Sequence, residues 1–227
     1  MDRMESRYRG DPGEVSAFSW VPDFARGNVR DLRVRWACEE IGRPYASVLL
    51  DATHQRGPDY TCWQPFGQVP AWRDAEVQLF ESGAILLYLG ESDDRLLPAD
   101  PQARWHATSW LVAALNSVEP FLGSLVDMRL FHADQPWAED AFATLRPQAE
   151  QRLAQLATAL GGREWLAGSF SVADIAMVTV LKIAHDLDLL PAHPVLAAYF
   201  ARGVSRPGHA RALAAQLADF SDEPPVQ

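Results

Sequence analysis

All the strand-like segments of this chain lie before Glu91, and every patterned segment after it is helical. The early segments are short, rich in β-branched residues and interrupted by one helical segment, whereas the later ones repeat apolar residues at helical spacing. A strand, helix, strand order implies a right-handed parallel unit. The pattern therefore predicts a small α/β sheet domain followed by an all-α domain.

In the first half, we expect strands at 15–21, 46–50, 69–73 and 77–80, and helices at 28–41 and 82–89. Asn28 predicts the cap of the first helix, with Asp31 at the capping-box position, and Gly42 ends that helix. The strands at 69–73 and 77–80 flank a short polar turn and therefore predict a hairpin.

In the second half, Asp100 and Pro101 open a helix that Pro120 breaks or kinks. A second long helix ends at Leu160, and Pro147 inside it could divide it into two pieces. Ser171-x-x-Asp174 is a capping-box pattern ahead of an apolar helix. Further helices are expected at 194–202 and 207–217, so the predicted domains are 14–92 and 101–220.

Composition excludes several classes of protein. The 227 residues carry 20 Lys and Arg against 30 Asp and Glu, a net charge of −10, which argues against a general nucleic-acid binder. No uninterrupted apolar run approaches the ~18 residues of a membrane span, and residues 1–13 lack the apolar centre of a secretory signal. The two cysteines, Cys38 and Cys62, match no metal-site spacing, so we expect free thiols, no metal and a cytoplasmic location.

Four segments together resemble the cytosolic glutathione transferases, in the order and spacing of that family. They are Leu32-Arg-Val-Arg-Trp-Ala-Cys-Glu-Glu-Ile-Gly42, Phe66-Gly-Gln-Val-Pro-Ala-Trp72, Leu79-Phe-Glu-Ser-Gly-Ala-Ile85 and Trp165-Leu-Ala-Gly-Ser-Phe-Ser-Val-Ala-Asp-Ile175. The resemblance implies a thioredoxin-like N-terminal domain, a helical C-terminal domain and a homodimer. It also implies a detoxifying transferase that joins glutathione to an electrophilic small molecule at a site between the domains.

The resemblance assigns the glutathione site to Gln68, Val69, Pro70, Glu81 and Ser82. It implies a cis peptide before Pro70, which would let the Val69 N–H and C=O both face the ligand. Ser82 begins a helix whose first N–H groups favour an anion such as a carboxylate, and Glu81 could pair with the ligand's ammonium group. Gln68 is a candidate for the ligand's backbone or glycyl end. The structural alternatives are a plain serine cap and a surface amide.

The usual thiol-activating Tyr, Ser or Cys is missing, because residues 20–31 contain none of the three. Ser19 is the nearest hydroxyl, but it falls within the expected strand. A cation or a helix N-terminus can also lower a thiol pKa, so Arg26 and Asn28 are the candidate catalytic residues, with Arg30 nearby. Alternatively, these arginines line a solvated helix face, and Arg35 could pair with Glu39 at i,i+4.

This departure keeps other functions open. A glutathione-dependent isomerase, a thiol–disulfide reductase and a non-catalytic glutathione- or ligand-binding protein all fit the same scaffold. Cys62 could form a mixed disulfide with glutathione, although nothing near it in the sequence favours a thiolate. Cys38 is expected to be a small core residue of the first helix.

Overall fold

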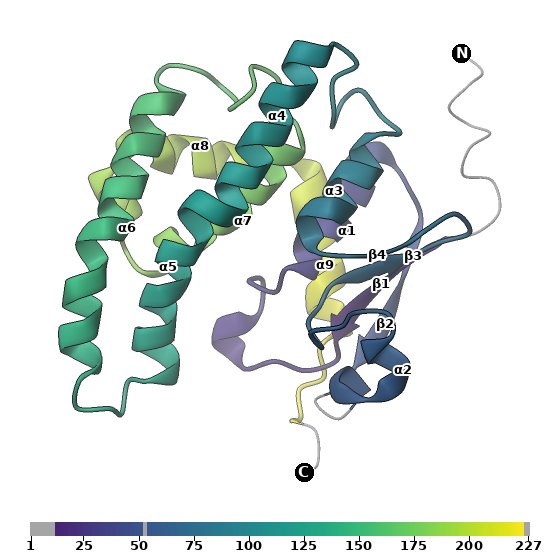
Figure 1. Ribbon diagram of the computed structural model, residues 1–227, viewed down its shortest axis with the longest axis horizontal. Helices are drawn as coiled ribbons and strands as arrows, with labels where there is room; N and C mark the ends of the chain where they lie inside the picture. Colours follow the sequence, from purple (N-terminus) through teal and green to yellow (C-terminus); the bar gives the residue numbers. More distant parts are fainter. Residues whose placement is uncertain (1–11, 52–53, 225–227) are drawn as a thin grey trace. The chain divides into compact units, whose positions relative to one another are not determined.

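The computed structural model describes residues 12–51 and 54–224, which fold into two compact units (Figure 1). One unit contains the described residues up to Leu96 together with those from Pro207 onward. The other comprises Leu97–Arg206. The first unit holds the whole sheet and the second is helical, as the strand pattern predicted.

The sheet has four strands in the order β2-β1-β3-β4. They are β1 (Gly13–Phe18), β2 (Tyr45–Leu50), β3 (Ala71–Arg73) and β4 (Gln78–Phe80). β1 and β2 are parallel, and the pairs β1–β3 and β3–β4 are antiparallel, which confirms the crossover and the hairpin. β1 ends at Phe18, before the predicted end at 21, because the chain leaves the sheet after the Ser19 N–H has reached the Leu50 carbonyl at 2.9 Å.

The helices of this unit are α1 (Asp31–Ile41), α2 (Pro58–Thr61), α3 (Ser82–Gly90) and α9 (Pro207–Asp219), with 3₁₀ turns at η1 (Asp23–Ala25) and η2 (His54–Arg56). The predicted Asn28 cap of α1 is wrong. The N-cap is Arg30, which makes no side-chain capping bond, and the Asn28 amide donates to the Phe24 carbonyl at 3.0 Å instead. Gly42 ends α1 in the left-handed conformation, as expected.

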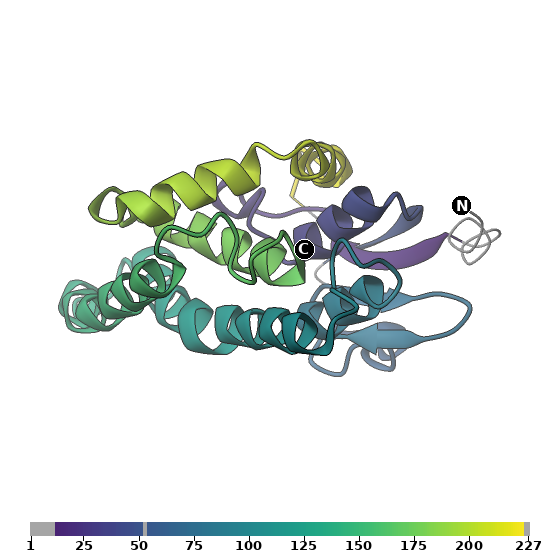
Figure 2. The same ribbon diagram turned by 90° about the horizontal axis from the view of Figure 1, so that it is seen from above.

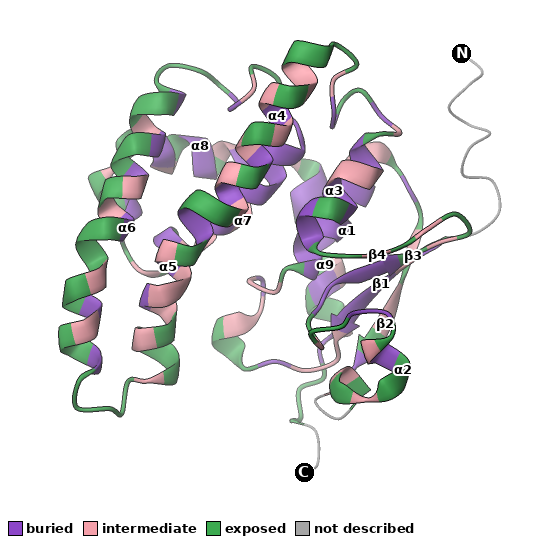
Figure 3. Ribbon diagram, viewed as in Figure 1, coloured by how far each residue is buried: buried purple, intermediate pink, exposed green. Residues whose placement is uncertain are grey.

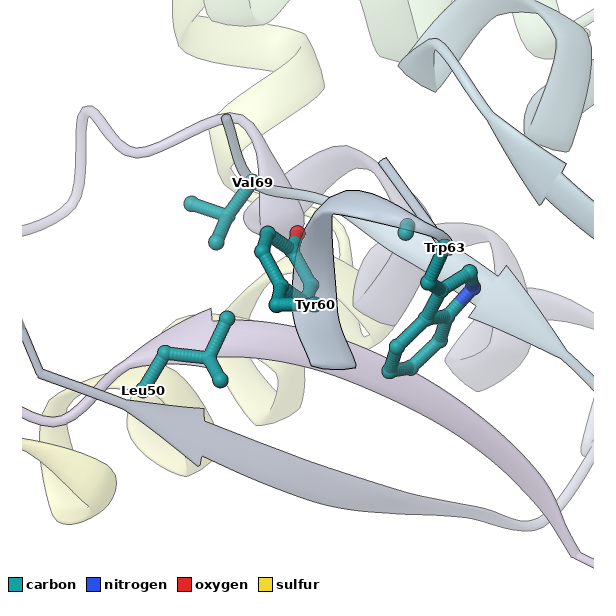
Figure 4. Packing of buried hydrophobic residues seen from close by; sticks show 5 residues of the cluster. Leu50, Tyr60, Trp63 and Val69 are labelled. Atoms are coloured by element: carbon teal, nitrogen blue, oxygen red, sulfur yellow. The ribbon is translucent and has the colours of Figure 1, made fainter. Parts of the chain in front are cut away.

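Two apolar layers enclose the sheet. Val15 and Ala17 alternate with Ser16 along β1, so the hydroxyl faces away from these two side chains. On the Ser16 face, Tyr60 and Trp63 pack in a cluster with Leu50, Val69 and Ala71 (Figure 4). This cluster anchors the segment that leads into β3.

The second unit is a bundle built around one buried helix. Its elements are α4 (Pro101–Ala113), the π-helical turn η3 (Ala114–Val118), α5 (Glu119–Val126), the π-helical turn η4 (Asp127–Phe131), α6 (Ala138–Leu160), α7 (Val172–Asp186), η5 (Leu190–Ala192) and α8 (Pro194–Val204). α7 is buried along most of its length (Figure 3). It packs against α4 and α8, and in the view from above it lies between them (Figure 2).

Two prolines within helical stretches behave differently. Pro120 follows the η3 π-turn, so the predicted interruption is a local widening of the helix rather than a break. Pro147 is exposed inside α6, which continues as one helix from Ala138 to Leu160 and is not divided. The carbonyl that loses its partner there can be solvated.

The stretch Pro101–Phe131 passes a length and composition test for a membrane span, although no single apolar run indicated it. One such helix is weak evidence for a membrane span, because mostly buried core helices of soluble proteins have the same length and composition; here 33% of the apolar window is buried. Leu111, Leu122 and Leu125 on this stretch are buried, and α4 and α5 both pack against α7. These contacts are those of a bundle helix.

The expected helical domain at 101–220 needs one correction. α9 lies beside α1 and belongs to the sheet-containing unit, so the helical unit ends at Arg206. The reason is polar as well as apolar, since Arg211 and Gln216 of α9 bond to Glu39 and Asp31 of α1. The helical periodicity of 207–217 predicts a helix but does not indicate which unit that helix packs against.

Candidate functional site

The segment before β3 presents an unpaired stretch of main chain. The Val69–Pro70 peptide bond is cis, as the resemblance implied. The Val69 side chain packs into the cluster with Tyr60 and Trp63. Within the described residues, no hydrogen bond engages the N–H or the C=O of Val69. This residue can therefore pair with a peptide-like ligand as an edge strand does.

A chain of hydrogen bonds holds both sides of this segment. The Ala71 N–H donates to Ser16 Oγ at 2.6 Å, and Ser16 Oγ lies 2.8 Å from the Tyr60 hydroxyl. The Tyr60 hydroxyl in turn donates to the Gln68 carbonyl. Burial raises the pKa of Tyr60, so the hydroxyl keeps its proton and remains a donor. Figure 4 shows the Tyr60 ring beneath the Val69 segment with its oxygen directed toward it.

The loop before Val69 is fixed by a buried amide. The Gln64 side chain is 2% exposed, and its oxygen accepts from the N–H groups of Phe66 and Gln68 at 2.6 and 3.2 Å. Gly67 between them has a φ of +64°, and a Cβ there would lie 2.8 Å from the Gln55 carbonyl oxygen. Only glycine fits this turn. The Gln68 side chain is exposed, and its main chain is bound on both sides.

The start of α3 is an open helix terminus. Glu81 is its N-cap and makes no side-chain capping bond. In the described part of the chain, the N–H groups of Ser82, Gly83 and Ala84 have no acceptor. Glu81 has a φ of +70°, which is unusual for a residue other than glycine, and its side chain is exposed. Three free donors and the helix dipole make this terminus suited to an anion.

A buried arginine that was not predicted as a site residue contacts the start of α3. Arg33 of α1 is 2% exposed, and its Nη1 donates to Ser82 Oγ at 3.2 Å. A hydroxyl that accepts from a guanidinium still has its own hydrogen to donate. Within the described residues, no acceptor takes the Ser82 hydroxyl hydrogen. No local pattern in the sequence indicated that Arg33 would be buried, because α1 also carries the charged residues Asp31, Arg35 and Glu39.

The hairpin register brings the two features together. Ala71 pairs with Phe80 in the β3–β4 ladder. Pro70 precedes Ala71 and Glu81 follows Phe80, so the cis segment and the start of α3 are neighbours at one end of the hairpin. The predicted glutathione-site residues therefore lie at or next to this end of the hairpin: Gln68, Val69, Pro70, Glu81 and Ser82. This end offers peptide-type pairing next to a helix start suited to an anion.

The predicted catalytic residues lie in the loop between β1 and α1. The Arg26 guanidinium lies 3.4 Å from Asp23 and donates to the Ser221 carbonyl at 3.2 Å. The Asn28 amide group donates within its own loop. The Ser19 hydroxyl donates to the Leu50 carbonyl at 3.2 Å. Arg26 is thus bound to Ser221, which follows α9, and Ser19 is bound to the last residue of β2.

Two other residues place this loop relative to the cis segment. Val29 packs against the cluster that contains Val69. Arg30 follows it as the exposed N-cap of α1. The remaining arginines do not form the solvated face considered above, since Arg33 and Arg35 are buried and Arg35 pairs with Asp31 and Asp219 at 2.7 Å each. The exposed cation at the helix start is therefore Arg30.

The cysteines and possible metal ligands add no second centre. Cys38 is fully buried, as expected, and burial raises its pKa to about 12. Cys62 is exposed at the end of α2, where its Sγ lies 3.1 Å from the Asp59 carbonyl oxygen. In residues 12–51 and 54–224, no group of three or more His, Cys, Asp or Glu side chains could hold a metal ion.

Two family models and a known relative match this chain. The family model described as the glutathione S-transferase N-terminal domain matches residues 24–91, and the model of the C-terminal domain matches 121–207. Glutathione S-transferase-like protein OpS6 of Beauveria bassiana is 30% identical over 190 residues, which are 77% of this chain and 85% of that protein.

Solved structures are similar over most of the chain. A glutathione transferase family member from Pseudomonas fluorescens, with two glutathione bound, has a TM-score of 0.78 at 26% identity, covering 88% of this chain and 92% of its own. A glutathione transferase from Burkholderia graminis, with two glutathione molecules bound per subunit, has a TM-score of 0.77 at 25% identity, covering 88% and 87%.

Proposed function

The chain belongs to the glutathione S-transferase family, and from that premise we propose that it binds glutathione on its sheet-containing unit and joins the glutathione sulfur to an electrophilic small molecule. The observation that carries the proposal is the pairing of two open features at one end of the hairpin. One is the unpaired main chain of Val69. The other is the uncapped start of α3, where Ser82 meets the Arg33 guanidinium.

These features match the chemistry of glutathione, an anionic tripeptide with a central thiol. The cysteinyl N–H and C=O pair with the Val69 main chain, next to Pro70. The γ-glutamyl carboxylate accepts from the first N–H groups of α3 and from the Ser82 hydroxyl, with the Arg33 charge behind them. The exposed Glu81 carboxylate pairs with the ligand's ammonium group, and the Gln68 amide bonds to the glycyl end.

The thiol is activated from the start of α1. An ordinary cysteine thiol has a pKa near ~8.5, and a cation at a helix N-terminus lowers it. Arg30 supplies that cation at the N-cap, with Asn28 two residues before it, while the contacts of Arg26 direct its charge toward the C-terminal end of the chain. The thiol proton leaves to water, and the sulfur lone pair forms the new S–C bond as the electrophile's leaving group departs with its bonding electrons.

Other properties are proposed on the premise of the family. The chain acts as a homodimer in the cytoplasm, in a detoxifying role, without a metal. An exposed aromatic pair supports a contact with a second copy, since Phe66 and Phe80 are 69% and 39% exposed with ring centroids 6.2 Å apart. The missing Tyr, Ser or Cys in residues 20–31 favours a second candidate, a glutathione-binding protein that does not activate the thiol.

The test measures glutathione binding by calorimetry and the thiolate absorbance of the bound ligand against pH. We expect the wild-type chain to bind glutathione with a lowered thiol pKa. Arg30→Ala should raise that pKa by about one unit, which is about 1.36 kcal/mol of lost thiolate stabilisation. Arg56→Ala, which removes an exposed arginine of the same unit, is the matched control.

The outcomes separate the candidates. Binding without a lowered thiol pKa identifies the non-catalytic binder. A larger effect of Arg26→Ala or Asn28→Ala than of Arg30→Ala moves the activating role to that residue. Turnover of a disulfide or of an isomerisable substrate, without conjugation, identifies the reductase or the isomerase. Absence of binding refutes the whole proposal.

A further inference from the structure

Residues just before the last described position lie against the loop to which we assign thiol activation. This C-terminal segment, Gln216–Asp222, comprises the last turn of α9 and the residues just after it. It meets the loop between β1 and α1 at the loop's first residue, where the Ser221 N–H donates to the Ser19 carbonyl at 2.7 Å. The two bonded residues are separated by almost the whole length of the sequence.

Gln216 holds the other end of the same loop. Its side chain is 1% exposed, and Nε2 donates to the Val29 carbonyl at 3.1 Å and to Asp31 Oδ1 at 2.7 Å. Val29 and Asp31 are the neighbours of Arg30 on either side. One amide group thus fixes the backbone before the N-cap of α1 and the side chain after it.

The middle of the loop is held as well. The Arg26 guanidinium donates to the Ser221 carbonyl at 3.2 Å, and it lies 5.8 Å from the centroid of the Phe220 ring. Gly27 has a φ of +77°, and a Cβ there would lie 3.2 Å from Cδ1 of Leu213 in α9. The C-terminal residues therefore contact the loop at its start, middle and end.

A buried arginine of α1 forms two ion pairs, one within α1 and one with α9. Arg35 donates to Asp31 and to Asp219, at 2.7 Å in each case, and its side chain is 1% exposed. Burial raises the pKa of Asp31 to about 6, against the lowering effects of Arg35 and Gln216. The first carboxylate of α1 thus depends on donors that include a residue of α9.

We propose that the C-terminal segment is a positioning element for thiol activation, in which Gln216 fixes the place of Arg30 at the start of α1. This inference rests on the proposed function. Gln216 acts through the loop, because its bonds go to Val29 and Asp31. The glutathione-binding groups at Val69 and Ser82 are held by other contacts, with Tyr60, Ser16 and Arg33. Loss of Gln216 should therefore affect the thiol more than the affinity.

The experiment compares Gln216→Met with Arg211→Met in the full chain. Methionine keeps the length and packing of Gln216 and removes both donors. Arg211 also joins α9 to α1, through Glu39 near the other end of α1, at 2.7 Å to the carboxylate and 2.9 Å to the carbonyl. We expect Gln216→Met to raise the pKa of bound glutathione by about one unit, a tenfold loss of thiolate at fixed pH, with its Kd changed less than about threefold. Arg211→Met should leave the thiol pKa unchanged.

A second variant keeps the inference testable if Gln216→Met fails to fold. Gln216→Asn is shorter, stays polar and cannot reach both acceptors, so a smaller shift of the same sign is expected. An equal thiol pKa in wild type and both Gln216 variants overturns the inference while the proposed function stands. A shift that Arg211→Met reproduces also overturns it, since any loosening of α9 would then suffice. A wild-type chain that binds no glutathione overturns the proposed function, and this inference with it.

Discussion

A buried serine lies at the start of α3 and another at the start of α7, but the two serines differ in their position and in their partners. Ser171 is the N-cap of α7, and its side chain and that of Asp174 close a complete capping box. Ser82 is the first residue of α3, which has no side-chain cap. Asp174 at the third position of α7 has its counterpart in Ala84 of α3, which has no carboxylate to close the box.

The difference separates a structural terminus from the terminus that we propose binds glutathione. The start of α7 is buried and uses its donors internally, because Asp174 accepts from Leu166, Ser171 and Tyr199 at 2.7–3.2 Å. The start of α3 leaves its N–H groups free and adds the Arg33 guanidinium, whose charge attracts an anion. A helix start with spare donors and a nearby cation is suited to an anion, whereas one with its donors satisfied stabilises the fold.

The largest effect is expected from Asp174→Ala. Burial raises the pKa of Asp174 despite its donors, and removal of the carboxylate leaves the Leu166 and Ser171 N–H groups and the Tyr199 hydroxyl without an acceptor. Each such buried group costs ~1–3 kcal/mol and three of them lose their acceptor, so the free energy of unfolding should fall by at least about 3 kcal/mol in denaturant titrations.

Its control is Asp100→Ala at the exposed N-cap of α4, whose side chain accepts from the Ala103 N–H and from no other donor in the described part of the chain. Loss of that cap should cost about 1 kcal/mol. Equal losses for the two variants would mean that the start of α7 contributes no more than any surface cap, and the contrast with α3 would disappear.

Ser171→Ala should have an intermediate effect. The Ala173 N–H loses its acceptor at 3.3 Å, while Asp174 keeps its bond to the Ser171 main chain. We expect a loss of ~0.5–2 kcal/mol in the free energy of unfolding, with an unchanged glutathione Kd by calorimetry. A weaker affinity at unchanged stability would show that this terminus, too, takes part in ligand binding.

Sequence predicted these two helix starts because each depends on neighbours in the chain. The capping box spans four residues, and the Val-Pro segment and Ser82 belong to short motifs that the resemblance recognised. Arg33 and Gln216 were missed because their roles depend on residues 49 and 185 positions away in the sequence. No local pattern indicates that a helix arginine will be buried against another helix start.

In the β1–α1 loop, a local sequence pattern led to a wrong prediction because distant residues determine the conformation. Asn28 has the residue type of a cap, but its amide bonds to Phe24, and α1 begins three residues later. The loop's conformation is set by Ser221 and Gln216, at the far end of the sequence. The proposed preference for Arg30 over Arg26 and Asn28 therefore rests on the position of the C-terminal segment, which composition and spacing do not contain.

The smallest effect on stability is expected from Ser82→Ala, where the contrast is sharpest. Its hydroxyl accepts only from Arg33 within the described residues, and the helix has no cap to lose, so the free energy of unfolding should change by less than about 0.5 kcal/mol. The glutathione Kd should rise about tenfold, which corresponds to ~1.4 kcal/mol, because the ligand carboxylate loses a donor.

Ser92→Ala is the matched control just beyond the other end of α3, where the Ser92 hydroxyl donates to the Leu89 carbonyl at 2.6 Å and has no other partner among the described residues. It should leave the affinity unchanged. If Ser82→Ala instead lowers stability as much as Ser171→Ala and leaves the Kd as it was, Ser82 serves the fold through Arg33. The anion site would then have to rely on the N–H groups of α3 alone, and the two helix starts would differ in geometry but not in purpose.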